Sequence, residues 1–131
     1  MVASHILVTG VAGFIGSHVA KRLVEDGYSV VGLDDMNDYY DVSLKKARLE
    51  RVVPDSVEVV TGDILDRGLL QRLASKHSFD CVIHLAAQAG VHYSLDHPDT
   101  YIQTNIQGTN NVFELAREFG ISKVVFASSS S

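Results

Sequence analysis

The sequence is poor in cysteine and contains no long apolar run. Its 131 residues include one cysteine, Cys81, so an internal disulfide cannot form. A lone cysteine fits a reducing compartment, and the first residues lack the basic start and apolar stretch of a secretory signal. Because no apolar run is long enough to cross a membrane, we expect a cytoplasmic protein with no membrane partner.

Positive charge is also scarce, since 11 lysines and arginines stand against 16 acidic residues and give a net charge of -5. This balance argues against nucleic acid as a partner, because nucleic acids attract basic surfaces. It still allows a phosphorylated ligand, which backbone amides can bind inside an acidic protein. The histidines show no metal-ligand spacing with cysteine or carboxylate partners, so no metal site is expected.

Short β-branched runs alternate with longer helical patterns along one domain, residues 1–131. The expected strands are residues 6–8, 30–33, 57–61, 81–85 and 124–126. The expected helices are residues 13–26, residues 41–53, a helix that Asp66 caps, and residues 98–119. Strands separated by helices indicate right-handed βαβ units. The sequence therefore predicts an α/β fold, a Rossmann-type doubly wound parallel sheet with strands in the order 3-2-1-4-5. Within it, Cys81 is expected to be a packed strand thiol rather than a nucleophile.

The strongest motif is Thr9-Gly-Val-Ala-Gly-Phe-Ile-Gly16, which follows the first strand and opens a helix. Gly10 permits a tight turn, and Gly13 removes a side chain where a pyrophosphate must approach the backbone. Gly16 lets the helix pack closely. The helix N-terminus presents free N–H groups and a partial positive charge to phosphates. In this context the motif favours dinucleotide binding over a plain strand-helix turn.

An acidic pair ends the second strand. Asp34 lies about twenty residues past the glycines, where a carboxylate can accept hydrogen bonds from the ribose hydroxyls of a dinucleotide. Its charge would also repel the extra phosphate of NADP, so the expected cofactor is NAD. Asp35 is a secondary candidate, and a solvated turn is the alternative for both residues.

Weaker signals follow the third and fourth strands. Asp63 could accept a hydrogen bond from the adenine amino group, and the small residues Ala86 and Ala87 would let the backbone pass close to a cofactor. His84 fits a packed structural histidine better than a catalyst. The sequence has no nucleophile elbow and no Walker-type lysine after the glycines, which disfavours serine hydrolysis and ATP hydrolysis.

Taken together, these motifs resemble the extended short-chain dehydrogenases/reductases, and specifically the NAD-dependent epimerase/dehydratase family. The resemblance runs through the glycine motif, Asp34, Asp63-Ile64, residues 84–87, Asn105, Gly108-Thr109 and residues 128–130. Residues 35–49 and 87–94 are further similar to the UDP-glucuronate 4-epimerases. Two positions depart from that pattern: Asp35 replaces an asparagine and His92 replaces an arginine. The second change bears on substrate carboxylate recognition, because an imidazole cannot reproduce a bidentate guanidinium contact.

The resemblance implies a role for each matching residue. The implied cofactor contacts are Gly10, Gly13, Phe14, Ile15, Gly16, Asp34, Asp35, Asn37, Asp63, Ile64, Leu85, Ala86, Ala87 and Thr104. The implied substrate contacts are Gln88, His92 and Ser129. Ser129 would also be the catalytic hydroxyl, with Ser128 and Ser130 as alternatives within the same serine run.

The family's catalytic Tyr-x-x-x-Lys does not occur in these 131 residues; Tyr101, for example, is followed by Asn105 at the lysine position. We therefore expect the N-terminal part of a nucleotide-sugar epimerase, truncated before the last strands and the substrate lobe and inactive alone. The resemblance implies that the whole enzyme inverts carbon four of a UDP-sugar such as UDP-glucuronate through a 4-keto intermediate, as a homodimer. The alternatives are a nucleotide-sugar dehydratase or decarboxylase, a non-catalytic dinucleotide-binding module, and a nucleotide-free structural domain.

Overall fold

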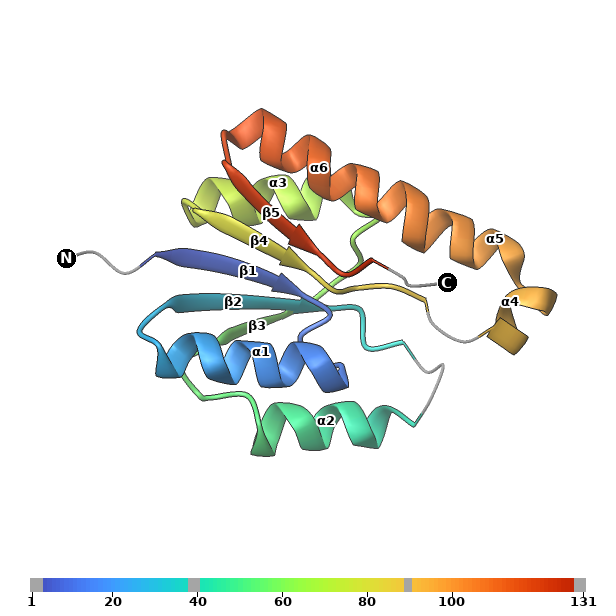
Figure 1. Ribbon diagram of the computed structural model, residues 1–131, viewed down its shortest axis with the longest axis horizontal. Helices are drawn as coiled ribbons and strands as arrows, with labels where there is room; N and C mark the ends of the chain where they lie inside the picture. Colours follow the sequence, from blue (N-terminus) through green and yellow to red (C-terminus); the bar gives the residue numbers. More distant parts are fainter. Residues whose placement is uncertain (1–3, 38–40, 89–90, 129–131) are drawn as a thin grey trace.

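The computed structural model describes residues 4–37, 41–88 and 91–128, with residues 91–93 described by their backbone only (Figure 1). Its strands are β1 (His5–Thr9), β2 (Ser29–Asp34), β3 (Glu58–Thr61), β4 (Cys81–His84) and β5 (Lys123–Phe126). Its helices are α1 (Phe14–Glu25), α2 (Val42–Arg51), α3 (Arg67–Lys76), α4 (Val91–Asp96), α5 (Pro98–Tyr101), the π-helix η1 (Ile102–Gln107) and α6 (Gly108–Phe119). Among these, no helix has both the length and the apolar character needed to span a membrane.

The five strands form one parallel sheet in the order β3-β2-β1-β4-β5, which confirms the predicted topology. Thr9 at the end of β1 lies opposite Leu33 on one side and His84 on the other. Because the strands are parallel, their carboxyl ends meet at a single edge of the sheet (Figure 1). The loops that carry the predicted site residues leave from this edge.

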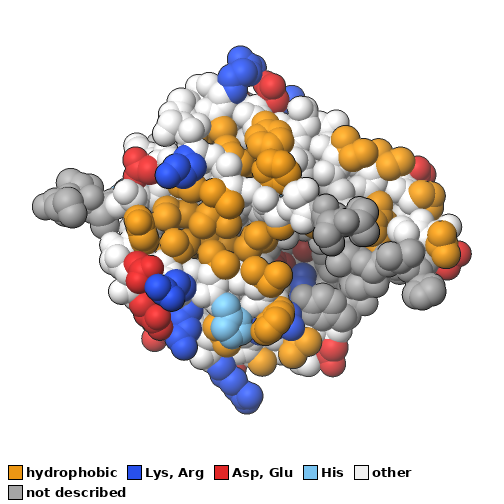
Figure 2. Space-filling model, in the orientation of Figure 1, with side chains coloured by type: hydrophobic (Ala, Val, Ile, Leu, Met, Phe, Trp, Pro, Cys, Tyr) orange, Lys and Arg blue, Asp and Glu red, His pale blue; other side chains and the backbone are white. Residues whose placement is uncertain are grey.

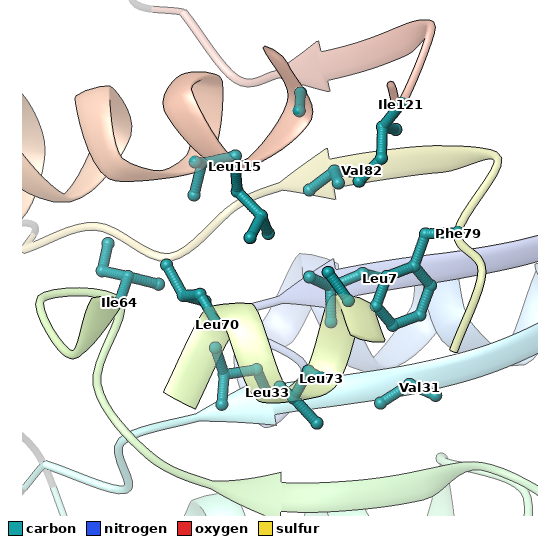
Figure 3. Close-up of a cluster of buried hydrophobic side chains, with 13 residues drawn as sticks. Leu7, Val31, Leu33, Ile64, Leu70, Leu73, Phe79, Val82, Leu115 and Ile121 are labelled. Carbon is teal, nitrogen blue, oxygen red and sulfur yellow. The ribbon is translucent and has the colours of Figure 1, made fainter. Parts of the chain in front are cut away.

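Helices cover both faces of the sheet, with α3 and α6 on one face and α1 and α2 on the other (Figure 1). Two apolar cores result. The first packs β-strand residues against α3 and α6 and includes Leu7, Leu33, Leu70, Val82 and Leu115 (Figure 3). The second lies beneath α1 and α2 and includes Val8, Val11, Ala20, Val30 and Val57. Strands buried on both faces explain the continuous apolar runs in the sequence.

Several local predictions are confirmed. Asp66 caps α3 by accepting a hydrogen bond from the Leu69 N–H at 3.0 Å. Gly27 and Gly120 follow α1 and α6 with φ angles of 94° and 68°, the left-handed conformation in which glycine commonly ends a helix. Cys81 is partly buried in β4, and burial raises the pKa of its thiol, so it has the character of a packed thiol.

One helix prediction was wrong in detail, and one buried residue was not predicted. The single helix expected at 98–119 is divided into α5, the π-helix η1 and α6, and a further short helix, α4, precedes it. A π-helical segment of six residues is too short to alter the apolar periodicity on which the prediction relied. In α2, the apolar Leu44 is 47% exposed, whereas the neighbouring Lys45 is buried, which its sequence pattern did not predict. The ion pair between Lys45 and Asp34, at the end of β2, fixes this orientation of α2.

Candidate functional site

An open cleft of about 680 Å³ lies at the carboxyl edge of the sheet. It is lined by Gly10, Gly13, Leu33, Asp34, Asp35, Asn37, Lys45, Gly62, Asp63, Ile64, Leu85, Ala86, Ala87, Gln88 and Thr104. These residues come from the loops after four strands, from α2 and from η1. The position is where open α/β sheets bind their ligands.

The turn after β1 is built on close backbone contacts that need glycine. Gly10 has a φ of 75°, and a Cβ atom there would lie 2.9 Å from the backbone nitrogen of Ala86. A Cβ atom at Gly16 would overlap the carbonyl oxygen of Gly10 and lie 2.8 Å from its carbonyl carbon. The turn is closed by the Gly13 N–H, which donates to the Gly10 carbonyl at 3.0 Å, and the Gly10 N–H joins it to β2 by donating to the Leu33 carbonyl at 2.7 Å. These contacts seat the first turn of α1 directly on the glycine loop.

The N-terminus of α1 opens on the cleft. Gly13 is the N-cap residue, so no side chain occupies the position that a serine or aspartate would fill. The first backbone N–H groups of a helix have no partner within the helix and carry partial positive charge. The side chains of Phe14 and Ile15 are exposed and do not belong to the cleft lining, while Gly16 is buried beneath the turn. This end of the cleft can therefore accept an anion through backbone groups.

Asp34 is buried, with an exposed fraction of 6%, so the solvated-turn alternative for this residue was wrong. Its Oδ2 accepts a hydrogen bond from the Ala12 N–H at 3.0 Å, and its Oδ1 accepts one from the Met36 N–H at 2.9 Å. The ammonium of Lys45 donates to the same Oδ1 at 3.0 Å. Met36 has a φ of 55°, an unusual left-handed conformation in this tight loop. Asp34 thus ties the glycine loop, its own loop and α2 together at the wall of the cleft.

The neighbouring residues form a local polar loop. Asp35 is exposed, and its Oδ1 accepts from both the backbone N–H and the side-chain amide of Asn37, at 3.1 and 3.0 Å. The Lys45 ammonium lies 3.8 Å from the same oxygen of Asp35. Lys45 was not among the predicted site residues. An isolated lysine in an amphipathic helix is usually solvated, and the only signal was its place in the helix that follows the acidic pair.

The loop after β3 contributes an acid and an apolar wall. Asp63 is exposed, and its Oδ1 accepts from the Leu65 N–H at 2.9 Å, which leaves its other oxygen for further hydrogen bonds. Ile64 is buried, and its carbonyl accepts from the amide of Asn111 at 3.0 Å. These contacts hold the loop against α6.

The loop after β4 is held by Thr9 and His84. The Thr9 hydroxyl oxygen accepts from the N–H groups of Leu85 and Ala86 at 3.0 and 3.1 Å. Its own proton is then directed to the Nδ1 of His84, 2.7 Å away. The Nε2 of His84 must carry the ring proton, and it donates to the Thr109 hydroxyl at 3.1 Å. Burial lowers the pKa of His84 to about 4, so the ring is neutral near pH 7. His84 therefore positions the loop, in line with the structural role the sequence indicated.

The π-helix η1 completes the wall beside this loop. The side-chain oxygen of Asn105 accepts from the Gln88 N–H at 2.8 Å, and its amide nitrogen donates to the Gln88 carbonyl at 3.1 Å. The neighbouring Thr104 lines the cleft. The Thr109 hydroxyl donates to the carbonyl of Asn105 at 2.7 Å, which connects η1 to His84. The structure thus brings Gln88 and Thr104 to the same cleft as the glycine loop.

Two predicted residues fall outside this description. Ser129, the candidate catalytic hydroxyl, lies outside the described residues, and so does the side chain of His92, whose backbone belongs to α4. Ser128 is described and is exposed beyond β5, whose strand is continued by a hydrogen bond from the Ala127 N–H to the His84 carbonyl at 3.3 Å. The described residues also contain no group of three potential metal ligands.

Known proteins with similar sequences include UDP-glucuronate 4-epimerases. UDP-glucuronate 4-epimerase 4 of Arabidopsis thaliana is 46% identical over 127 residues, which are 96% of this chain and 29% of the relative. Protein CapI of Staphylococcus aureus is 44% identical over 126 residues, which are 96% of this chain and 38% of the relative. The chain therefore spans well under half the length of these relatives.

Solved structures agree with this similarity. The UDP-glucose 4-epimerase of Thermotoga maritima, solved with UDP-glucose, matches 95% of this chain and 38% of its own, with a TM-score of 0.83 and 35% identity. The UDP-glucose 4-epimerase of Brucella ovis, solved with NAD, matches 98% of this chain and 36% of its own, with a TM-score of 0.81 and 35% identity. The family model described as GDP-mannose 4,6 dehydratase matches residues 7–131. The chain therefore belongs to this family of NAD-dependent epimerases and dehydratases, within the extended short-chain dehydrogenases/reductases.

Proposed function

We propose that residues 1–131 are the NAD-binding domain of a nucleotide-sugar epimerase. The observation that carries the proposal is Asp34, a buried carboxylate at the cleft wall that is hydrogen-bonded to the glycine loop through Ala12. This places the group suited to a ribose diol beside the backbone suited to a pyrophosphate. The similar epimerase of Brucella ovis was solved with NAD, which supports the same cofactor here.

Each part of the cleft fits one part of the dinucleotide. The N-terminus of α1 at Gly13 would bind the pyrophosphate, and Asp34 would accept a hydrogen bond from the adenosine ribose. Asp63 would face the adenine, and the small residues Ala86 and Ala87 would leave room for the nicotinamide. When bound, NAD would supply the hydride acceptor and donor for inversion at carbon four of the sugar. The His84 hydrogen bonds would hold the nicotinamide loop in place.

We further propose a UDP-sugar as the substrate of the whole enzyme, because the most similar relatives include UDP-glucuronate 4-epimerases and UDP-glucose 4-epimerases. Gln88 and His92 would contact the sugar, and Ser129 would donate a hydrogen bond to the reacting oxygen. If His92 occupies the position of a carboxylate-binding arginine, His92→Arg should raise activity toward UDP-glucuronate relative to a neutral UDP-sugar. A whole enzyme that is already specific for UDP-glucuronate with His92 intact would exclude that role.

Residues 1–131 alone should bind the cofactor without catalysing epimerisation. They lack the Tyr-x-x-x-Lys of the family, and a serine hydroxyl such as that of Ser129 needs an activating base. A dehydratase or decarboxylase uses the same cofactor half, so sugar-nucleotide chromatography with the whole enzyme separates these activities. Turnover by the purified 131-residue chain would contradict the proposal.

We also propose that the whole enzyme is a cytoplasmic homodimer and that the 131-residue chain itself tends to self-associate. Hydrophobic side chains gather over β5, β4 and β1 between α6 and α1 (Figure 2). Val125 and Phe126 in β5 are 49% and 50% exposed, and Phe113 of α6, which contacts Phe126 edge to face, is 41% exposed. Exposed apolar surface of this kind favours association. Sedimentation of the chain at several concentrations tests it, and a strictly monomeric chain would contradict it.

The test of cofactor binding is a calorimetric titration of the chain with NAD+ and, separately, NADP+. A charged hydrogen bond such as that from a ribose hydroxyl to Asp34 contributes about 1.5–3 kcal/mol. We therefore expect NAD+ to bind at least roughly tenfold more tightly than NADP+. Absence of NAD+ binding would overturn the proposal in favour of a nucleotide-free domain.

A further inference from the structure

Lys45 is a buried cation at the cofactor cleft. Its side chain is 6% exposed, and the side chain of its partner Asp34 is 5% exposed. The ammonium lies 3.0 Å from Oδ1 of Asp34 and 3.8 Å from Oδ1 of Asp35, and Lys45 itself lines the cleft. A lysine is almost never this buried without a paired charge. The pair therefore places a fixed positive charge beside the carboxylate that would recognise the ribose.

A second cation from the same helix lies nearby. Arg48 donates a hydrogen bond to the carbonyl of Ala12 at 3.4 Å, and its guanidinium lies 6.0 Å from the centre of the Phe14 ring. Helix α2 thus presents two cations, three residues apart, to the glycine loop and the acidic pair. Among the described residues of this corner, the carboxylates of Asp34 and Asp35 lie close to the cations of Lys45 and Arg48. Neutralising one carboxylate would shift the charge of this corner toward positive.

We propose that Lys45 determines the cofactor preference of this site, an inference that rests on the proposed binding of NAD. With Asp34 ionised, Lys45 holds the carboxylate in place for the ribose hydroxyls. When the Asp34 charge is removed, the same ammonium becomes the binding group for the 2′-phosphate of NADP. The strength of the preference for NAD is therefore set by the Asp34–Lys45 pair: Asp34 repels the 2′-phosphate, and Lys45 beside it offsets part of that repulsion.

The stereochemistry supports both roles. Lys45 and the backbone N–H groups of Ala12 and Met36 already donate three hydrogen bonds to Asp34, so the carboxylate is held in one orientation. A carboxylate offers about four acceptor positions, which leaves one for a ribose hydroxyl. An ammonium on a flexible stem can turn from a carboxylate to a phosphate without moving the backbone. Asparagine at position 34 would remove the negative charge nearest to Lys45, while its single oxygen could still accept from one of the two backbone N–H groups.

The test compares the ratio of the dissociation constants of NADP+ and NAD+ in four proteins: wild type, Asp34→Asn, Lys45→Met and the double variant. Asp34→Asn should lower the ratio at least roughly tenfold, because a charged hydrogen bond to phosphate replaces electrostatic repulsion. Lys45→Met should raise the ratio. The double variant should bind NADP+ at least roughly tenfold more weakly than Asp34→Asn, because its phosphate partner is gone.

Matched controls are available on the same chain. Lys46→Met and Asp55→Asn change the same side-chain types at exposed positions and should leave the ratio unchanged. A ratio measured within one protein is insensitive to a general loss of stability. If Asp34→Asn does not fold, Lys45→Met still tests the role of Lys45, because Asp34 keeps its two backbone N–H donors in that variant.

The outcomes separate the two proposals. Wild-type protein that binds neither nucleotide contradicts NAD binding itself. If the wild type prefers NAD+, two results would contradict the role of Lys45 and leave NAD binding intact. One is an equal ratio in Asp34→Asn and the double variant, and the other is an unchanged ratio in Lys45→Met. A lowered ratio in Asp34→Asn that depends on Lys45 supports it.

Discussion

The Nδ1 atom of His84 lies 2.7 Å from the hydroxyl oxygen of Thr9, which also accepts the N–H groups of the two residues after His84. Because that oxygen already has two donors, its proton points to the ring, and the ring proton sits on Nε2. The ends of β1 and β4 and the helix that carries Thr109 are thereby joined by one neutral histidine. The free energy of unfolding should therefore depend on the protonation of His84 and on the hydroxyl group of Thr9.

The first prediction concerns acid stability. Burial lowers the pKa of His84 from 6.5 to about 4 in the folded protein, so below pH 6.5 the unfolded chain binds this proton more readily. The stabilising contribution is complete above pH 6.5 and is lost as the pH falls toward 4. It should amount to about 2 kcal/mol of unfolding free energy lost between pH 7.5 and pH 5. Urea denaturation of the wild type and of His84→Gln at both pH values measures it.

The difference between the two proteins isolates His84, because carboxylates elsewhere titrate in both. His84→Gln should be less stable than wild type at pH 7.5 by about 1–3 kcal/mol, and this gap should shrink at pH 5. A gap that stays constant between the two pH values would contradict the neutral, buried ring.

The second prediction concerns Thr9. Thr9→Val preserves shape but leaves the Ala86 N–H and the His84 ring without their shared partner, while the Leu85 N–H keeps only the Thr9 carbonyl at 3.2 Å. Each unsatisfied buried group costs about 1–3 kcal/mol, so we expect at least about 2 kcal/mol of lost stability. The control is Thr61→Val, an exposed threonine at the end of β3, which should change stability by less than about 0.5 kcal/mol. Equal effects at the two positions would remove the special role of the Thr9 hydroxyl.

The third prediction separates the roles of two glycines. Gly16→Ala should destabilise the fold by about 2 kcal/mol or more, although alanine favours helices by about 1 kcal/mol, because its Cβ meets the Gly10 carbonyl. Gly13→Ala leaves its Cβ 3.1 Å from the same oxygen and should fold, but its methyl group would occupy the anion site. Its affinity for NAD+ should fall at least about tenfold. Thermal unfolding and calorimetry of both variants measure the contrast.

The helix glycine Gly68 provides the control for both variants. A Cβ there would lie 3.3 Å from the flexible end of the Arg72 side chain, so Gly68→Ala should keep NAD+ affinity and gain up to about 1 kcal/mol of stability. A Gly13→Ala protein that binds NAD+ as tightly as Gly68→Ala would mean that the pyrophosphate does not approach Gly13.

Much of the cleft was predictable because its residues lie at fixed positions of a repeating βαβ pattern. The glycine loop, Asp34, Asp63 and the small residues after β4 each follow a strand, and parallel strands bring their carboxyl ends to one edge. The same βαβ pattern, with right-handed crossovers, predicted the order of the strands.

The orientation of α2 could not be predicted in this way, because its apolar residues are few. Burial of Lys45 depends on the position of Asp34, which belongs to another element. The π-helix η1 was likewise hidden, since one wider turn leaves no trace in the sequence period, although it sets Thr104 and Asn105 beside the cleft.

The location of the NAD site is tested most directly by amide NMR shifts of the ¹⁵N-labelled chain during titration with NAD+. The account predicts the largest changes at Gly10, Gly13, Asp34, Ala86 and Ala87, which line the cleft, and small changes at the distant residues Gln71 and Glu118 between α3 and α6. No change at saturating NAD+, or changes centred on α3 and α6, would contradict it.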